Sequence, residues 1–193
     1  MAYGLRPVKR ADGMPYAGAV TNYLIDPAGE ATNIFNGQLV ALGSDGYIAL
    51  ATGDGSDATT NNLGGSSIGA IGVFVGCSYT NDQGQTVHSQ YYPSGALNGV
   101  AYVVDDPNVL FEADLNIAAT QTMIGNNTDL AAVQSTSTGS TTTGNSTSSL
   151  DGSAVATTTK AFKIVALRPS TGTEAVLVKI NPDYHHMTMN TGV

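Results

Sequence analysis

One serine motif in the chain has the spacing of a catalytic site. Gly65-Ser66-Ser67-Ile68-Gly69 fits the Gly-x-Ser-x-Gly pattern of a nucleophile elbow, where a serine occupies a sharp turn between a strand and a helix. Here a polar loop, residues 53–65, precedes the motif, and a strand-like segment with regularly spaced glycines follows it. These surroundings favour a loop-to-strand transition over a catalytic serine.

A group of carboxylates has the residue types of a calcium site. Asp105 and Asp106 precede Pro107-Asn108, and Glu112 and Asp114 lie two residues apart, on one face of the next expected strand. Oxygen ligands of this kind suit Ca²⁺. An Asx-type turn that caps a hairpin accounts for the same residues, and we favour it and expect no bound metal.

The three histidines offer a second candidate for metal or proton chemistry. His88 stands alone, whereas His185 and His186 are adjacent. Neighbouring residues on a strand point to opposite faces, so the pair is poorly placed to chelate one metal ion. We assign His185 and His186 to a subunit interface, where an imidazole would add pH sensitivity.

Paired tyrosines near His88 have the character of a ligand platform. Tyr91 and Tyr92 could stack a sugar or a base. Tyrosine pairs at strand ends are also typical of interfaces. We assign both to an interface and retain a glycan-binding site made with His88 as the alternative.

The remaining sequence is poor in catalytic groups. It contains three Glu, three His and one Cys, and it has no P-loop, paired Cys-x-x-Cys or dinucleotide fingerprint. Cys77 lies in a strand-like run without a nearby Lys, Arg or His to stabilise a thiolate, so we expect an inert thiol. The sequence therefore predicts a protein that is not an enzyme and needs no cofactor.

The composition indicates which elements carry these residues. Only 11% of residues are charged, against about 25% in ordinary domains, and 23 are glycine. This mixture disfavours helices. The formal charge of -8 argues against a nucleic-acid partner. We find no apolar run long enough to span a membrane and no apolar signal segment, so we expect synthesis in a cytoplasm.

Short apolar runs separated by turn residues predict about ten strands. Asp45-Gly46, between two apolar tetrapeptides, predicts a hairpin, because Asp-Gly accepts positive φ in a tight turn. The expected strands are Thr21–Ile25, Gln38–Leu42, Tyr47–Ala51, Ile68–Tyr79, Thr86–Tyr92, Ala101–Val104, Val109–Leu115, Phe162–Leu167 and Glu174–Ile180, with a weaker one at Asp129–Val133.

We therefore predict an all-β fold, an antiparallel barrel or jelly-roll-like sandwich. Residues 1–20 are expected to form an extended arm, residues 21–182 a single β domain, and residues 183–193 a tail. Serine and threonine fill 12 of the 16 positions in residues 134–149, so we expect a flexible loop over 134–159.

The arm carries three of the seven cationic residues within its first ten positions. Laid along a neighbour's sheet edge, it would add main-chain hydrogen bonds and direct its charges to carboxylates on the partner. The alternative is a solvated terminus. The interface residues expected here are Leu5, Arg6, Pro7, Val8, Lys9 and Arg10.

Two parts of the chain, residues 68–115 and 160–182, resemble a family of phage proteins. The segment Ala101–Glu112, with Asp105-Asp106-Pro107 at its centre, is similar to head decoration, or cement, proteins of tailed bacteriophages. The resemblance implies a homotrimer that binds the major capsid protein on the outer face of the virion. A receptor- or glycan-binding fibre module is the alternative function.

Overall fold

A computed structural model describes residues 3–134, 139–168, 175–190 and 192 of the chain. These residues form strands and short 3₁₀ helices, none of which is long and apolar enough to cross a membrane. The strands are β1 (Arg6–Arg10), β2 (Thr21–Leu24), β3 (Ile34–Phe35), β4 (Leu39–Leu42), β5 (Ile48–Leu50), β6 (Gly72–Thr80), β7 (Thr86–Ser89), β8 (Tyr91–Tyr92), β9 (Leu97–Val104), β10 (Val109–Asp114), β11 (Asn127–Thr128), β12 (Phe162–Leu167) and β13 (Ala175–Ile180). The helices are η1 (Gln121–Met123), η3 (Pro182–Tyr184) and η4 (His186–Thr188).

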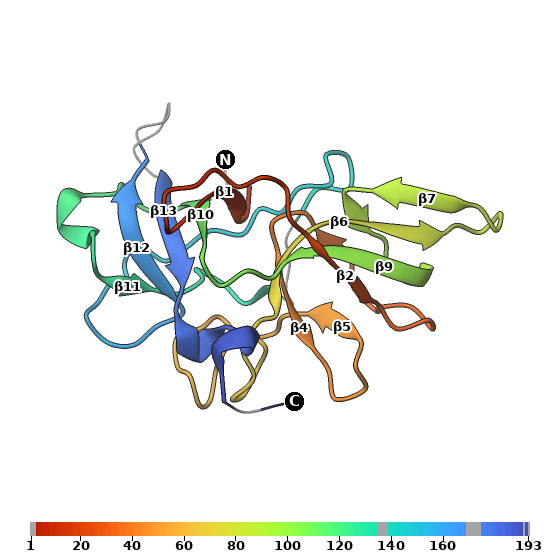
Figure 1. The fold of residues 1–193 in the computed structure, drawn as a ribbon, viewed down its shortest axis with the longest axis horizontal. Coiled ribbons are helices and arrows are strands. Elements are labelled where there is room, and N and C mark those ends of the chain that lie inside the picture. The colour runs from red at the N-terminus through yellow and green to blue at the C-terminus, as the bar shows by residue number, and fades with distance from the viewer. Residues whose placement is uncertain (1–2, 135–138, 169–174, 191, 193) are drawn as a thin grey trace.

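Two antiparallel sheets make up most of the molecule and lie toward opposite ends of its long axis (Figure 1). Sheet A has the order β1-β10-β13-β12-β11. Sheet B has the order β2-β9-β6-β4-β5, with β7 paired to β6. Strands β3 and β8 form a small third sheet. The predicted all-β fold is confirmed, although neither large sheet closes into a barrel in the described part of the chain.

The main hydrophobic core joins the two large sheets. Sheet A contributes Phe111, Phe162 and Val178, and sheet B contributes Leu39 and Val73, all nearly inaccessible to solvent. A second cluster lies beneath sheet B and includes Phe74 and Tyr92. Because successive residues of a strand point to opposite faces, β6 places Val73 in one core and Phe74 in the other.

The expected hairpins largely form. β4 and β5 pair in register around the Asp45-Gly46 turn, and Gly46 has the positive φ of 82° that this turn requires. β12 and β13 also pair, but the turn residues expected between them lie outside the described residues. Residues 129–133 do not form a strand; Leu130 makes only an isolated bridge to Leu150.

The expected N-terminal arm is not confirmed, because its first half belongs to a sheet of the same chain. Arg6–Arg10 form β1, which pairs with β10 at the edge of sheet A of the same chain. Leu5 is 3% exposed and packs in the main core, which explains why this segment folds back instead of extending away. The free energy of burying the leucine favours the intramolecular strand.

The described part of the Ser/Thr-rich segment is docked on the domain. The amide of Asn36 donates to the carbonyl of Gly144 at 3.0 Å, and the amide of Ser146 donates to the carbonyl of Asn36 at 2.9 Å. Gly139 lies directly against the ring of Phe35. These contacts give the position of the segment and not how much it moves, so its flexibility stays a prediction.

Candidate functional site

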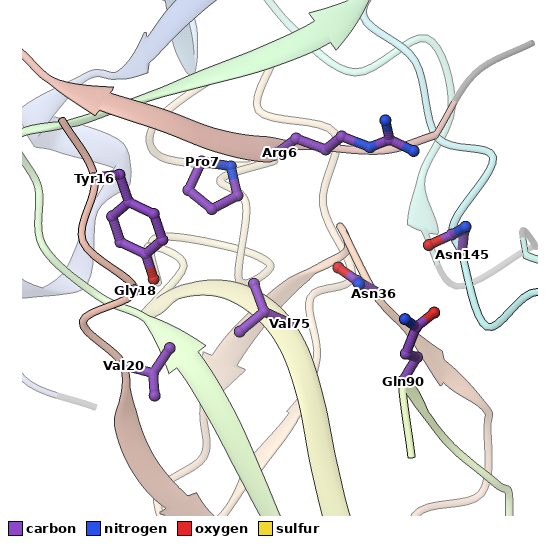
Figure 2. Close-up of a pocket in the computed structure, with 9 residues that line it drawn as sticks. All are labelled: Arg6, Pro7, Tyr16, Gly18, Val20, Asn36, Val75, Gln90 and Asn145. Atoms are coloured by element: carbon purple, nitrogen blue, oxygen red, sulfur yellow. The ribbon is translucent and has the colours of Figure 1, made fainter.

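An open groove of about 650 Å³ lies between the edge of sheet A and sheet B (Figure 2). Strand β1 forms one wall, β6 contributes a side chain at a bulge, and loops complete the rim. The lining residues are Arg6, Pro7, Tyr16, Gly18, Val20, Asn36, Val75, Gln90 and Asn145.

The groove has two chemically different halves, as Figure 2 shows. Pro7, Val20 and Val75 make an apolar half beside Tyr16. Arg6 extends toward the other half, where three amide side chains gather: those of Asn36, Gln90 and Asn145. Amide groups both donate and accept hydrogen bonds, so this half matches the peptide groups of an extended polypeptide.

Arg6 is the cationic group of this site. Its guanidinium carbon lies 4.0 Å from the centre of the Tyr3 ring, a cation–π contact. Glu112 faces Arg6 across the strand pair, but its carboxylate oxygens accept from the Tyr3 hydroxyl at 2.6 Å and pair with Arg168 at 2.7 Å. Arg6 makes no ion pair with any described residue and is exposed, so it can receive a carboxylate from a ligand.

The free edge of β1 is largely covered by the chain itself. Beyond a turn at residues 11–13, Arg10 donates its amide to the carbonyl of Met14 at 2.8 Å, and Lys9 bridges to Pro15. The strand addition expected for Val8, Lys9 and Arg10 therefore does not fit this edge, because residues 14–16 already occupy it.

Tyr91, Tyr92 and His88 do not form one ligand platform. Tyr92 is fully buried, which corrects its assignment to an exposed interface, and Tyr91 stacks on Phe35 with ring centres 5.6 Å apart. His88 lies instead beside Tyr102, and its Nδ1 is 3.1 Å from that hydroxyl. The alternative of a glycan site made by all three residues is therefore wrong, because Tyr92 is inaccessible to a ligand.

The adjacent histidines have different environments. His185 is 1% exposed, so its expected interface contact is wrong, whereas His186 is partly exposed. Tyr184 beside it lies in the main core, and His186 donates its amide to the Ala70 carbonyl at 2.8 Å. Burial lowers the pKa of His185 to about 4, against the opposing influence of Asp105 and Asp106.

Two of the candidate calcium ligands are taken up by protein contacts. Asp106 accepts from the Asn108 amide at 2.8 Å, as in an Asx turn, and pairs with Arg10 at 3.1 Å. Asp105 accepts from the Tyr23 hydroxyl at 2.9 Å. In the described residues, no three His, Cys, Asp or Glu side chains group where they would hold a metal ion.

One further residue and one motif match their expected environments. Cys77 is buried in β6, and burial raises the pKa of its thiol to about 12, which keeps it unreactive near neutral pH. The Gly-x-Ser-x-Gly motif lies in a polar turn, with no helix after it in the neighbouring described residues.

The sequence predicted Arg6 and Pro7 at a contact site but missed the rest of the groove. Tyr16, Val75 and Asn145 come from separate segments, and no local pattern connects them. Comparison of the chain with known protein families, curated proteins and solved structures finds no match in any of the three. The geometry of the site therefore carries the functional argument.

Proposed function

We propose that the chain is a capsid decoration protein of a tailed bacteriophage. It binds the outer surface of the phage head as a homotrimer and strengthens contacts between major capsid subunits. The observation that carries this proposal is the open groove at Arg6, whose amide and apolar halves suit an extended segment of a capsid subunit.

The chemistry of the groove favours a protein ligand. The side chains of Asn36, Gln90 and Asn145 can pair with main-chain groups, while Arg6 receives an acidic side chain and Val75 contacts an apolar one. Each copy makes a small contact of this kind. Three linked copies on a symmetric shell would gain affinity through effective concentration.

The net charge supports the outer location. At -8, the chain is repelled by packaged DNA, so the exterior of the shell suits it better than the interior. A virion location also agrees with the resemblance at Asp105-Asp106-Pro107. We expect light scattering to give the mass of three 19.7 kDa chains.

Cosedimentation with expanded shells of the major capsid protein from the same genome tests the proposal. We expect saturable binding, and a higher temperature of shell disruption when the protein is bound. The variant Gln90→Ala/Asn145→Ala removes two groove amides and should bind about ten-fold more weakly, at about 0.7 kcal/mol for each lost hydrogen bond.

The matched control removes two exposed amides outside the groove, Asn22→Ala/Gln83→Ala, and should bind like the unmodified protein. Absence of binding to expanded shells would reject the decoration function. Equal binding by both variants would reject the groove as the contact.

A further inference from the structure

The cationic residues are concentrated at one end of the molecule. All seven Lys and Arg residues lie at positions 6–10 or 160–179, and positions 11–159 hold none but carry 13 Asp and Glu residues. The cationic positions belong to or directly flank β1, β12 and β13, all of sheet A. Sheet A therefore carries the positive charge of an acidic protein, together with the carboxylates Glu112 and Asp114 of β10.

Three of these lysines form a row across the outer face of sheet A. Lys163 of β12 is directly opposite Lys179 of β13. Lys9 of β1 is opposite Leu110 of β10, one residue from the Phe111–Val178 pair. Val178 and Ile164, next to Lys179 and Lys163, point into the core, so these two lysines point outward. Lys9 is exposed as well, and Leu110, which lies between Lys9 and Lys179 in the row, is 4% exposed.

Within the part of the chain that the structure describes, none of the three lysines of the row is ion-paired. Arg10, Lys160 and Arg168 each pair with a carboxylate, whereas Lys9, Lys163 and Lys179 make no ion pair with a described residue. Lys179 donates only a long 3.4 Å hydrogen bond to Asn108. Like charges placed directly across two strands destabilise a sheet. The Lys163–Lys179 pair therefore lowers the stability of sheet A.

We infer that the outer face of sheet A binds an acidic protein surface through the row Lys9, Lys179 and Lys163. The row crosses four adjacent strands, a length of about 15 Å at the usual strand spacing. A folded partner can place several carboxylates along a surface of this length. Val165, which is 42% exposed on the neighbouring part of β12, adds an apolar contact. This inference rests on the proposed function, in which the partner is a capsid subunit.

A folded acidic surface fits better than a nucleic acid. The row supplies three charges, and the 13 carboxylates of residues 11–159, which include Glu112 and Asp114 of sheet A, repel a long polyanion. A protein surface can bring a few carboxylates to the row without presenting a long continuous run of negative charge to an acidic chain. The contact would weaken as salt increases.

The test compares two variants of equal net charge. Lys9→Gln/Lys163→Gln/Lys179→Gln removes the row and changes the charge from -8 to -11. The control, Asn22→Asp/Gln83→Glu/Gln85→Glu, also reaches -11, with all three changes at exposed positions of sheet B and its β6–β7 turn. On expanded shells we expect the lysine variant to bind about ten-fold more weakly, and the control to bind like the unmodified protein.

Binding of fluorescent poly-L-glutamate and of a 24-base-pair DNA duplex, followed by anisotropy at low salt, tests the face without shells. Lysine-dependent binding of polyglutamate supports the inference. Absence of polyglutamate binding, or stronger lysine-dependent binding of DNA, overturns it.

The shell experiment separates the two proposals. If the unmodified protein does not bind shells but binds polyglutamate through the lysines, the decoration function fails and the acidic-surface inference stands. If the unmodified protein and the lysine variant bind shells equally, the inference fails and the decoration function stands.

Discussion

A single buried histidine sets an acid limit on stability. His185 is 1% exposed, and its Nδ1 accepts from the Met187 amide at 3.3 Å, a contact that a doubly protonated ring cannot make. Burial lowers its pKa from 6.5 to about 4, while Asp105 and Asp106 act in the opposite direction and His186 and Lys179 lower it further. The folded state therefore binds this proton less readily than the unfolded state.

We expect the free energy of unfolding to fall as the pH decreases from 6.5 to 4. In this window the unfolded chain takes up the proton and the folded chain does not, which removes about 3 kcal/mol. Urea unfolding at pH 7.5, 6.5, 5.5 and 4.5 measures the slope. His185→Asn keeps a hydrogen-bond acceptor near the position of the Nδ1 atom and cannot titrate. The free energy of unfolding of this variant should therefore depend less steeply on pH. The same slope in both proteins would contradict this assignment.

Lys160 and Asp129 form a largely buried ion pair. Their charged atoms are 2.6 Å apart, and the side chains are 15% and 7% exposed. Burial raises the pKa of Asp129 despite the favourable lysine, and its second carboxylate oxygen has no hydrogen-bond partner among the described residues. The carboxylate thus depends on Lys160 to remain charged.

Lys160→Met should destabilise the protein by about 3 kcal/mol at pH 7, because it leaves the carboxylate buried and unpaired. The loss should shrink toward pH 4, since a raised pKa in the folded state lets Asp129 take up a proton there. Asp129→Leu/Lys160→Met removes both charges and should recover most of the stability in thermal unfolding. A double variant as unstable as Lys160→Met would show that packing, and not charge, is responsible.

At the scale of elements, local patterns predicted most of the longer strands and failed where distant segments meet. Asp45-Gly46 marked the β4–β5 hairpin because the turn geometry is specified by those two residues. β6 begins at Gly72, four residues after its expected start, because residues 68–71 run as an irregular segment whose Ala70 bridges to His185.

The groove could not be predicted in this way. Asn36 and Asn145 meet only because residues 139–149 dock beside β3, and a polar Ser/Thr-rich sequence gives no periodic signal for such docking. The pairing of β1 likewise depends on the burial of Leu5 under a distant part of the chain. Both features arise from tertiary packing.

Docking of residues 139–149 depends on the absence of a side chain at Gly139. A Cβ atom there would lie 2.2 Å from the Phe35 ring, and this glycine is not in the left-handed region of φ. Gly139→Ala should therefore cost about 1–3 kcal/mol through overpacking and should speed amide hydrogen exchange in residues 139–149.

Gly192→Ala is the control for Gly139→Ala, because a methyl group at position 192 would meet none of the described residues within 4 Å. If amide hydrogen exchange in residues 139–149 is as slow in Gly139→Ala as in the unmodified protein, the prediction is contradicted. The docked segment would then have room to accept a methyl group.

At the scale of the whole molecule, β6 couples the two hydrophobic cores. Val73 packs with both sheets in the main core, and Phe74 and Cys77 pack in the cluster beneath sheet B. β6 also pairs with β4, β7 and β9. Neither core can lose this strand without exposing apolar surface of the other.

The two cores should therefore unfold together. Cys77 reports on the cluster beneath sheet B, because its buried thiol should react about 1,000-fold more slowly at pH 8 than an exposed thiol, given its pKa of about 12. Amide exchange of Phe162–Leu167 reports on sheet A. In a urea series, pulse labelling of Cys77 and exchange of β12 should have the same midpoint. Labelling of Cys77 at lower urea, while β12 remains protected, would mean that sheet B opens independently and that β6 does not couple the cores.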